Sequence, residues 1–193
     1  MSKRLFAVVV VLVYSSQFLP AQEVSGYRAY ALASSVDAVL IESGSSAADV
    51  RVLHDRPAMI QELDWRARYA RNKFADPVRS IIFSFCDNAL YQVVVSYDTA
   101  RTEGLDNSDV IGALTATYGT AGPASAHNRP LEAAADTVIL AQWDRAGSSL
   151  TLLRGVYSAE FQLLLTSKVL GTRARGAIRE AGRLAAADSL RRE

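Results

Sequence analysis

The sequence predicts an α+β fold in which an antiparallel sheet carries helices on one face. Three observations predict it. Several runs of residues alternate between apolar and polar side chains, as strands with one buried face do. Two segments, residues 34–44 and 106–119, have apolar residues at helical spacing, and each precedes a group of strand-like runs. Residues 173–193 form a third predicted helix, so the order is helix then strands, twice, with a closing helix.

The N-terminal residues 1–21 have the three-part pattern of an export signal. Lys3 and Arg4 form a basic start, residues 5–14 are apolar, and a more polar exit ends at Ala21. The apolar run is about 10 residues long, too short to span a bilayer as a helix. We therefore expect cleavage after Ala21 and a periplasmic or secreted location for residues 22–193. The alternative is an N-terminus that stays uncleaved.

Residues 22–193 are enough for one domain of ordinary size. The only cysteine is Cys86, so no internal disulfide can form and a hydrophobic core has to stabilise the fold. Without Lys3 and Arg4 the formal net charge of +1 becomes −1. This balance gives no electrostatic reason to expect nucleic acid as a partner. We also expect no transmembrane segment in the mature chain.

The first half, residues 27–98, begins with a short edge strand at 27–32 and the helix at 34–44. Ser34 and Asp37 resemble a capping box at the start of this helix. Gly44 fits a cap at its C-terminal end.

Two predicted strands follow, at residues 50–53 and 59–69. In the second, Leu63 and Trp65 face one way, while Glu62, Asp64 and Arg66 face the other. The second set is polar and mixed in charge, so one face of the sheet is predicted to meet water.

Residues 79–98 are predicted to form the central hairpin, with its turn near Asp87 and Asn88. A two-residue loop would place Phe83 opposite Gln92 and mix the faces. A three-residue loop, 86–88, places Phe83 opposite Tyr91 and puts Asn88 in the left-handed position that asparagine tolerates. The predicted core face is then Ile81, Phe83, Phe85, Tyr91, Val93, Val95 and Tyr97.

The second half, residues 104–170, repeats the order of the first. The helix at 106–119 is bracketed by Asp106 and Asp109 at its start and by Gly119 at its end. A long loop precedes three strands, predicted at 137–144, 149–157 and 160–170. The closing helix, 173–193, has a thin apolar stripe, and the basic excess of residues 168–193 is typical of a solvated helix or tail. Such a helix can also bind an anionic membrane or an acidic partner.

The helix-then-strands unit resembles small exported modules of the SmpA/OmlA envelope-assembly type. In tandem it is similar to β-lactamase inhibitor proteins. The resemblance rests on residues 34–44 and 106–119 with the strands after each, and it covers most of residues 22–193. It implies a non-catalytic binding or scaffold role. The lipid-anchor cysteine of the SmpA/OmlA lipoproteins is absent from this sequence.

The sequence contains no clear motif of catalysis or metal binding. His54 and Asp55 are neighbours, and neighbours in an extended chain point apart, so a turn before Pro57 is the preferred interpretation. His54 and His127 lack the paired spacing of metal ligands. Cys86 is interpreted as a small packed residue, and Glu62 with Asp64 as partners of nearby arginines. We therefore predict no catalytic residue, no metal and no cofactor.

Aromatic residues on the strands have two interpretations. They are core residues by default. They could instead form an exposed patch that binds a partner, and the candidates are Trp65, Tyr69, Tyr91, Tyr97 and Trp143. We expect an exported, non-catalytic binding or scaffold domain of the bacterial cell envelope, with a protein or envelope component as its partner. The alternatives are a carrier of a small apolar ligand and, third, a hydrolase.

Overall fold

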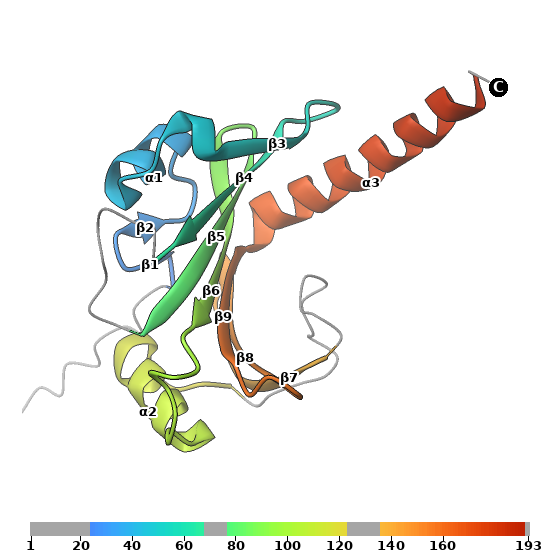
Figure 1. Ribbon diagram of the computed structural model, residues 1–193. Helices are drawn as coiled ribbons and strands as arrows, with labels where there is room; N and C mark the ends of the chain where they lie inside the picture. Colours follow the sequence, from blue (N-terminus) through green and yellow to red (C-terminus); the bar gives the residue numbers. More distant parts are fainter. Residues whose placement is uncertain (1–23, 68–76, 123–135, 192–193) are drawn as a thin grey trace, which may run out of the picture.

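A computed structural model describes residues 24–67, 77–122 and 136–191, and the side chain of Leu190 is not among the described parts. The predicted signal peptide therefore lies outside the described residues. Within them the fold is a seven-stranded antiparallel sheet of order β3-β4-β5-β6-β9-β8-β7, a two-stranded sheet and three α-helices (Figure 1). The predicted α+β class with an antiparallel sheet is confirmed. The elements are β1 Gly26–Tyr27, β2 Tyr30–Ala31, α1 Val36–Ser43, β3 Val50–His54, β4 Ile60–Arg66, β5 Val78–Cys86, β6 Ala89–Tyr97, α2 Asn107–Tyr118, β7 Thr137–Asp144, β8 Ser148–Gly155, β9 Phe161–Ser167 and α3 Lys168–Leu190.

The large sheet has helices on both faces. The β1–β2 hairpin, α1 and α2 cover one face, which we call the core face, and α3 leaves the sheet on the other side (Figure 1). Phe83, Trp143 and Leu163 belong to the cluster of buried side chains on the core face, together with Leu40 of α1 and Leu114 of α2. α1 and α2 thus share one face, as expected for the predicted repeat.

The two short helices begin and end where local sequence signals place them. Ser35 accepts a hydrogen bond from the Ala38 N–H at the start of α1, one residue after the predicted cap, and Gly44 ends the helix with a φ of 66°. Asp106 and Asp109 form a complete capping box at the start of α2, and Gly119 follows its last turn.

The register of the central hairpin differs from the prediction. The turn has two residues, Asp87 and Asn88, with φ angles of 47° and 65°. Asn88 is therefore left-handed as expected, but the three-residue loop is wrong. Phe83 lies opposite Val93, and Tyr91 is the extra residue of a β-bulge between the Ser84–Gln92 pair and the Phe85–Leu90 pair. The bulge keeps the apolar residues in register despite the short turn. As a result, Leu90 lies on the core face, where Tyr91 was predicted.

The C-terminal helix begins earlier than predicted, directly after β9. Ser167 caps it by accepting a hydrogen bond from the Leu170 N–H. Ala174 and Ala177 pack on a second buried cluster that contains Ile60, Cys86 and Tyr91. In residues 24–67, 77–122 and 136–191, no helix combines the length and apolar character needed to cross a membrane.

Candidate functional site

The predicted aromatic candidates do not form an exposed patch. Trp65 and Trp143 are buried on the core face, where the Trp143 indole N–H donates to the Gly119 carbonyl at 2.6 Å. Tyr91 is buried beneath α3, on the opposite side of the sheet. Tyr97 is half-buried against the core, and burial raises the pKa of its phenol. Tyr69 lies outside the described residues. The described candidates are therefore packing residues, because the sheet is covered where they point.

The face of the sheet opposite the core carries mostly polar side chains at its centre, and we call it the polar face. The pairing of the strands lines up a row of such residues across five strands: Glu62, Ser84, Gln92, Thr166 and Ser149. Gln92 and Thr166 are buried, and the Gln92 amide donates to the Thr166 hydroxyl at 3.4 Å. A polar row in the middle of a sheet costs free energy unless it is hydrogen-bonded. Its presence indicates that this face does not serve only as a second apolar core.

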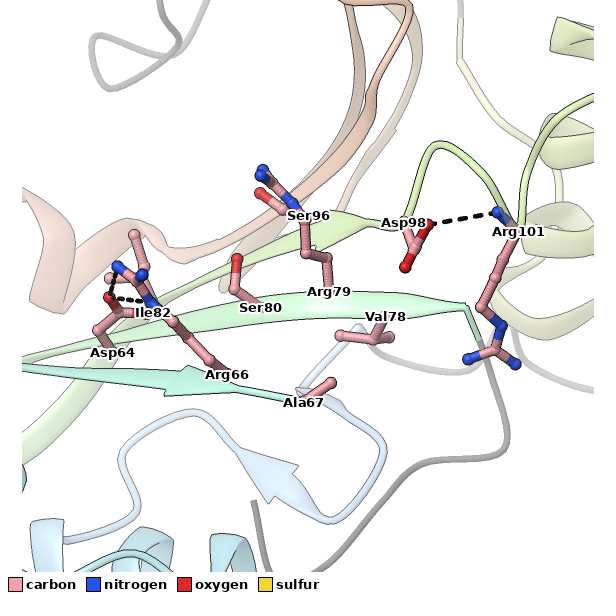
Figure 2. A pocket seen from close by; sticks show the side chains of 10 residues that line it. All are labelled: Asp64, Arg66, Ala67, Val78, Arg79, Ser80, Ile82, Ser96, Asp98 and Arg101. Carbon is pink, nitrogen blue, oxygen red and sulfur yellow. Dashed lines mark hydrogen bonds and ion pairs between the residues drawn. The ribbon is translucent and has the colours of Figure 1, made fainter. Parts of the chain in front are cut away.

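A pocket of about 600 Å³ opens at the end of the polar face that is remote from the hairpin turn. We call it the arginine pocket. Its walls come from β4, β5, β6 and the segment after β6, and Figure 2 shows the side chains. The lining residues are Asp64, Arg66, Ala67, Val78, Arg79, Ser80, Ile82, Ser96, Asp98 and Arg101. The guanidinium groups of Arg66 and Arg79, the Asp64 carboxylate and the hydroxyls of Ser80 and Ser96 thus lie on adjacent strands, while Asp98 and Arg101 come from the segment after β6 (Figure 2).

A second β-bulge directs Arg79 to the pocket. Val78 pairs with Tyr97 and Ser80 pairs with Ser96, so Arg79 is the extra residue on β5. Without the bulge, alternation from the buried Ile81 would leave Arg79 facing the core and Val78 facing water. With it, Val78 is buried in the core and Arg79 is exposed beside Ser80 and Ser96 (Figure 2). Bulges that re-aim a side chain are over-represented next to functional sites.

Ion pairs and backbone bonds hold the charged groups of the pocket in place. Arg66 donates from Nε and Nη2 to one oxygen of Asp64, at 2.9 and 2.6 Å. Arg79 forms an ion pair with Glu160, at the start of β9. Asp98 accepts from the backbone N–H groups of Ala100 and Arg101, at 2.9 and 3.3 Å, so the carboxylate fixes the loop after β6.

The pocket offers groups that recognise oxygen-rich ligands. A guanidinium presents planar N–H donors that match a carboxylate or a phosphate. Ser80 is partly exposed and Ser96 is largely buried, and their hydroxyls can donate and accept. A hydrolytic serine needs a base within hydrogen-bond distance, whereas the carboxylate of Asp64 is already bonded to Arg66.

The sequence did not predict most of this pocket. Glu62 and Asp64 were expected to form cross-strand ion pairs. Glu62 does so with Arg51 of β3 at 2.6 Å, whereas Asp64 pairs with Arg66 of its own strand. Arg79, Ser80 and Ser96 were overlooked. Their signal is the adjacent polar pair Arg79-Ser80 between apolar Val78 and Ile81, which interrupts the alternation as a bulge does.

Other sequence candidates lie apart from the pocket. Cys86 is buried at the hairpin end, and burial is the main cause that raises the pKa of its thiol. His54 ends β3, and His127 is outside the described residues. Within the parts of the chain that the structure describes, no cluster of three or more His, Cys, Asp or Glu side chains could hold a metal ion.

Comparison of the chain with protein-family models, with curated proteins and with solved structures found no match. The resemblance to SmpA/OmlA modules and β-lactamase inhibitor proteins therefore stays a prediction.

Proposed function

We propose that this chain is an exported, non-catalytic domain that uses the arginine pocket to bind a protein or another component of the bacterial cell envelope. The observation that carries the proposal is the gathering of Arg66, Arg79, Ser80 and Ser96 on three adjacent strands. Groups held on strands keep their positions better than groups on loops, which favours recognition of a defined partner.

The pairing of the arginines also supports binding. A guanidinium that already holds a carboxylate is oriented before a ligand arrives, so less conformational entropy is lost on binding. Arg66 and Arg79 are both more than half exposed while paired, with side-chain exposures of 51% and 57%. Both guanidinium groups are therefore accessible to a carboxylate or phosphate of the partner. A small apolar ligand, the alternative from the sequence, could make no hydrogen bond to these charged groups and would remove them from water.

Export is tested by the N-terminus of the protein that cells produce. The three-part pattern of residues 1–21 leads us to expect a mature chain that starts at or near Gln22. Mass spectrometry of the protein from an envelope fraction measures this. A chain that starts at Met1 in that fraction would refute export with cleavage.

Binding through the pocket is tested by comparing three forms of the chain in affinity capture from envelope extract. The pocket variant is Arg66→Gln with Arg79→Gln. The matched control is Arg51→Gln, which breaks a similar surface ion pair on β3, outside the pocket. We expect one component to be captured by the wild-type and control chains and lost from the pocket variant. Equal capture by all three would show that the pocket is not the binding site.

A further inference from the structure

The C-terminal helix α3 carries a separate feature that the arginine pocket does not explain. α3 has 23 residues and is therefore about 34 Å long. Its first turns pack on the sheet, and its C-terminal half extends beyond the sheet (Figure 1). From residue 182 to residue 189 every side chain is exposed.

The exposed side of α3 carries three arginines in a line. Arg175, Arg179 and Arg183 are four residues apart, so they share one face of the helix. The packed residues Ala174, Ala177 and Ala181 occupy the opposite face. We call the three arginines the arginine stripe. Like charges four residues apart destabilise a helix, and of the three arginines Arg183 has a compensating ion pair within α3, with Glu180 at 2.9 Å.

Charge is divided unevenly between α3 and the rest of the chain. Residues 168–191 have six Lys and Arg side chains and two Asp and Glu side chains, a net charge of +4. Residues 22–167 have 12 Lys and Arg side chains and 17 Asp and Glu side chains, a net charge of −5. Such a division orients a protein at an anionic surface, because the helix is attracted while the body is repelled.

We propose that the arginine stripe of α3 binds the surface of a bilayer that contains anionic phospholipid, with the helix lying along the surface. The stripe follows one line along the helix, and Arg183 belongs to the C-terminal half of α3, which extends beyond the sheet (Figure 1). The exposed apolar residues Ile178 and Leu184 lie off the stripe, so the contact is electrostatic and does not require insertion.

A second copy of the chain would be another anionic partner for the stripe. Several carboxylates of the body, among them those of Asp64, Asp87 and Asp144, already pair with a basic side chain of the same molecule, so a stripe docked on them would have to displace those partners. Within the stripe, Arg183 pairs with Glu180 at 2.9 Å, an exposed contact that a phosphate can replace. Self-association of the chain is therefore an outcome that the test has to distinguish.

Co-sedimentation with vesicles tests the proposal independently of the arginine pocket. The chain is used as cells produce it, with its N-terminal residue determined. The probes are vesicles of phosphatidylcholine alone and vesicles with phosphatidylglycerol added. The stripe variant is Arg179→Gln with Arg183→Gln, and the control is Arg28→Gln with Arg51→Gln, which removes the same charge from exposed positions of the body. All variants keep the same N-terminus, so a difference between them comes from the substituted arginines.

We expect binding only to vesicles with phosphatidylglycerol, and weaker binding as salt rises from about 0.05 M to about 0.5 M. Each basic residue near such a surface contributes about a fivefold factor, so the stripe variant should bind about 30-fold more weakly. The control should keep most of its binding. Circular dichroism should show unchanged helix content, since glutamine is a good helix former.

Four results would overturn the proposal. They are no binding to anionic vesicles at low salt, equal binding to phosphatidylcholine vesicles, equal losses in the two variants, and self-association in light scattering that the stripe variant alone abolishes. The last result would assign the stripe to a second copy of the chain. Loss of partner capture by the pocket variant with normal vesicle binding would leave this proposal intact.

Discussion

Substitution of Asn88 separates the two roles that this residue has at the turn of the central hairpin. Its φ of 65° is left-handed, a conformation that costs a residue such as alanine about 1–2 kcal/mol. Its side-chain oxygen accepts a hydrogen bond from the Val36 N–H at 3.0 Å, in the first turn of α1. That N–H has no partner within the helix, so the bond contributes about 1 kcal/mol.

Three variants of Asn88 distinguish the backbone role from the hydrogen bond. Asn88→Ala loses both and should lower the free energy of unfolding by about 2–3 kcal/mol. In Asn88→Gly, the glycine adopts the left-handed conformation without strain, but the hydrogen bond is lost and the unfolded chain becomes more flexible. This variant should lower the free energy of unfolding by about 1–2 kcal/mol. Asn88→Asp keeps an acceptor and a residue suited to the turn, so it should change stability by less than about 0.5 kcal/mol.

Urea unfolding followed by circular dichroism measures these differences as shifts of the midpoint at constant slope. The Asn88→Asp variant should be the most stable of the three, followed by Asn88→Gly and then Asn88→Ala. If Asn88→Ala is as stable as Asn88→Gly, the left-handed conformation of Asn88 does not limit stability. If Asn88→Asp lowers stability as much as Asn88→Ala, the hydrogen bond to the Val36 N–H does not contribute.

Three further predictions concern the core, the pH dependence and His54. Phe83→Ala should cost about 3–4 kcal/mol in urea unfolding, because Phe83 is fully buried and its ring centroid lies 4.6 Å from that of Tyr30; a cost below about 1 kcal/mol would contradict this. Burial raises the pKa of Tyr30 from 10.0 to about 12. The free energy of unfolding should therefore be constant below pH 10 with respect to this group and fall as the pH rises toward 12. The Tyr30→Phe variant should show a smaller fall. His54→Ala should change stability by no more than about 0.5 kcal/mol, since His54 is only partly covered at the end of β3; a larger change, or loss of bound zinc in elemental analysis, would refute this.

Much of the fold follows from local patterns. Residues 137–144 were predicted as a strand, and β7 has these bounds, Thr137–Asp144. Capping residues placed both ends of α2 because a helix terminus satisfies its free N–H groups locally. Signals of this kind need no knowledge of what the element packs against.

The bulges could not be predicted by the same counting. Alternation assumes one residue opposite one residue, and at Arg79 and Tyr91 two residues oppose one. The prediction kept the pairing regular and lengthened the turn instead. As a result, Tyr91 was assigned to the wrong face of the sheet, and Tyr91 was also one of the candidates for the binding patch. The arginine pocket depends on the other bulge, so most of it was missed for the same physical reason.

The turn at Asp87 and Asn88 shows most directly why a site can escape sequence analysis. Asn88 bonds Val36 of α1, 52 residues away. Asp87 accepts from the Met59 N–H at 2.9 Å, 28 residues away, and pairs with Arg173 of α3, 86 residues away. Neighbouring side chains of one turn therefore attach a helix on each face of the sheet. A local signal identifies the turn, but only the folded chain identifies its partners.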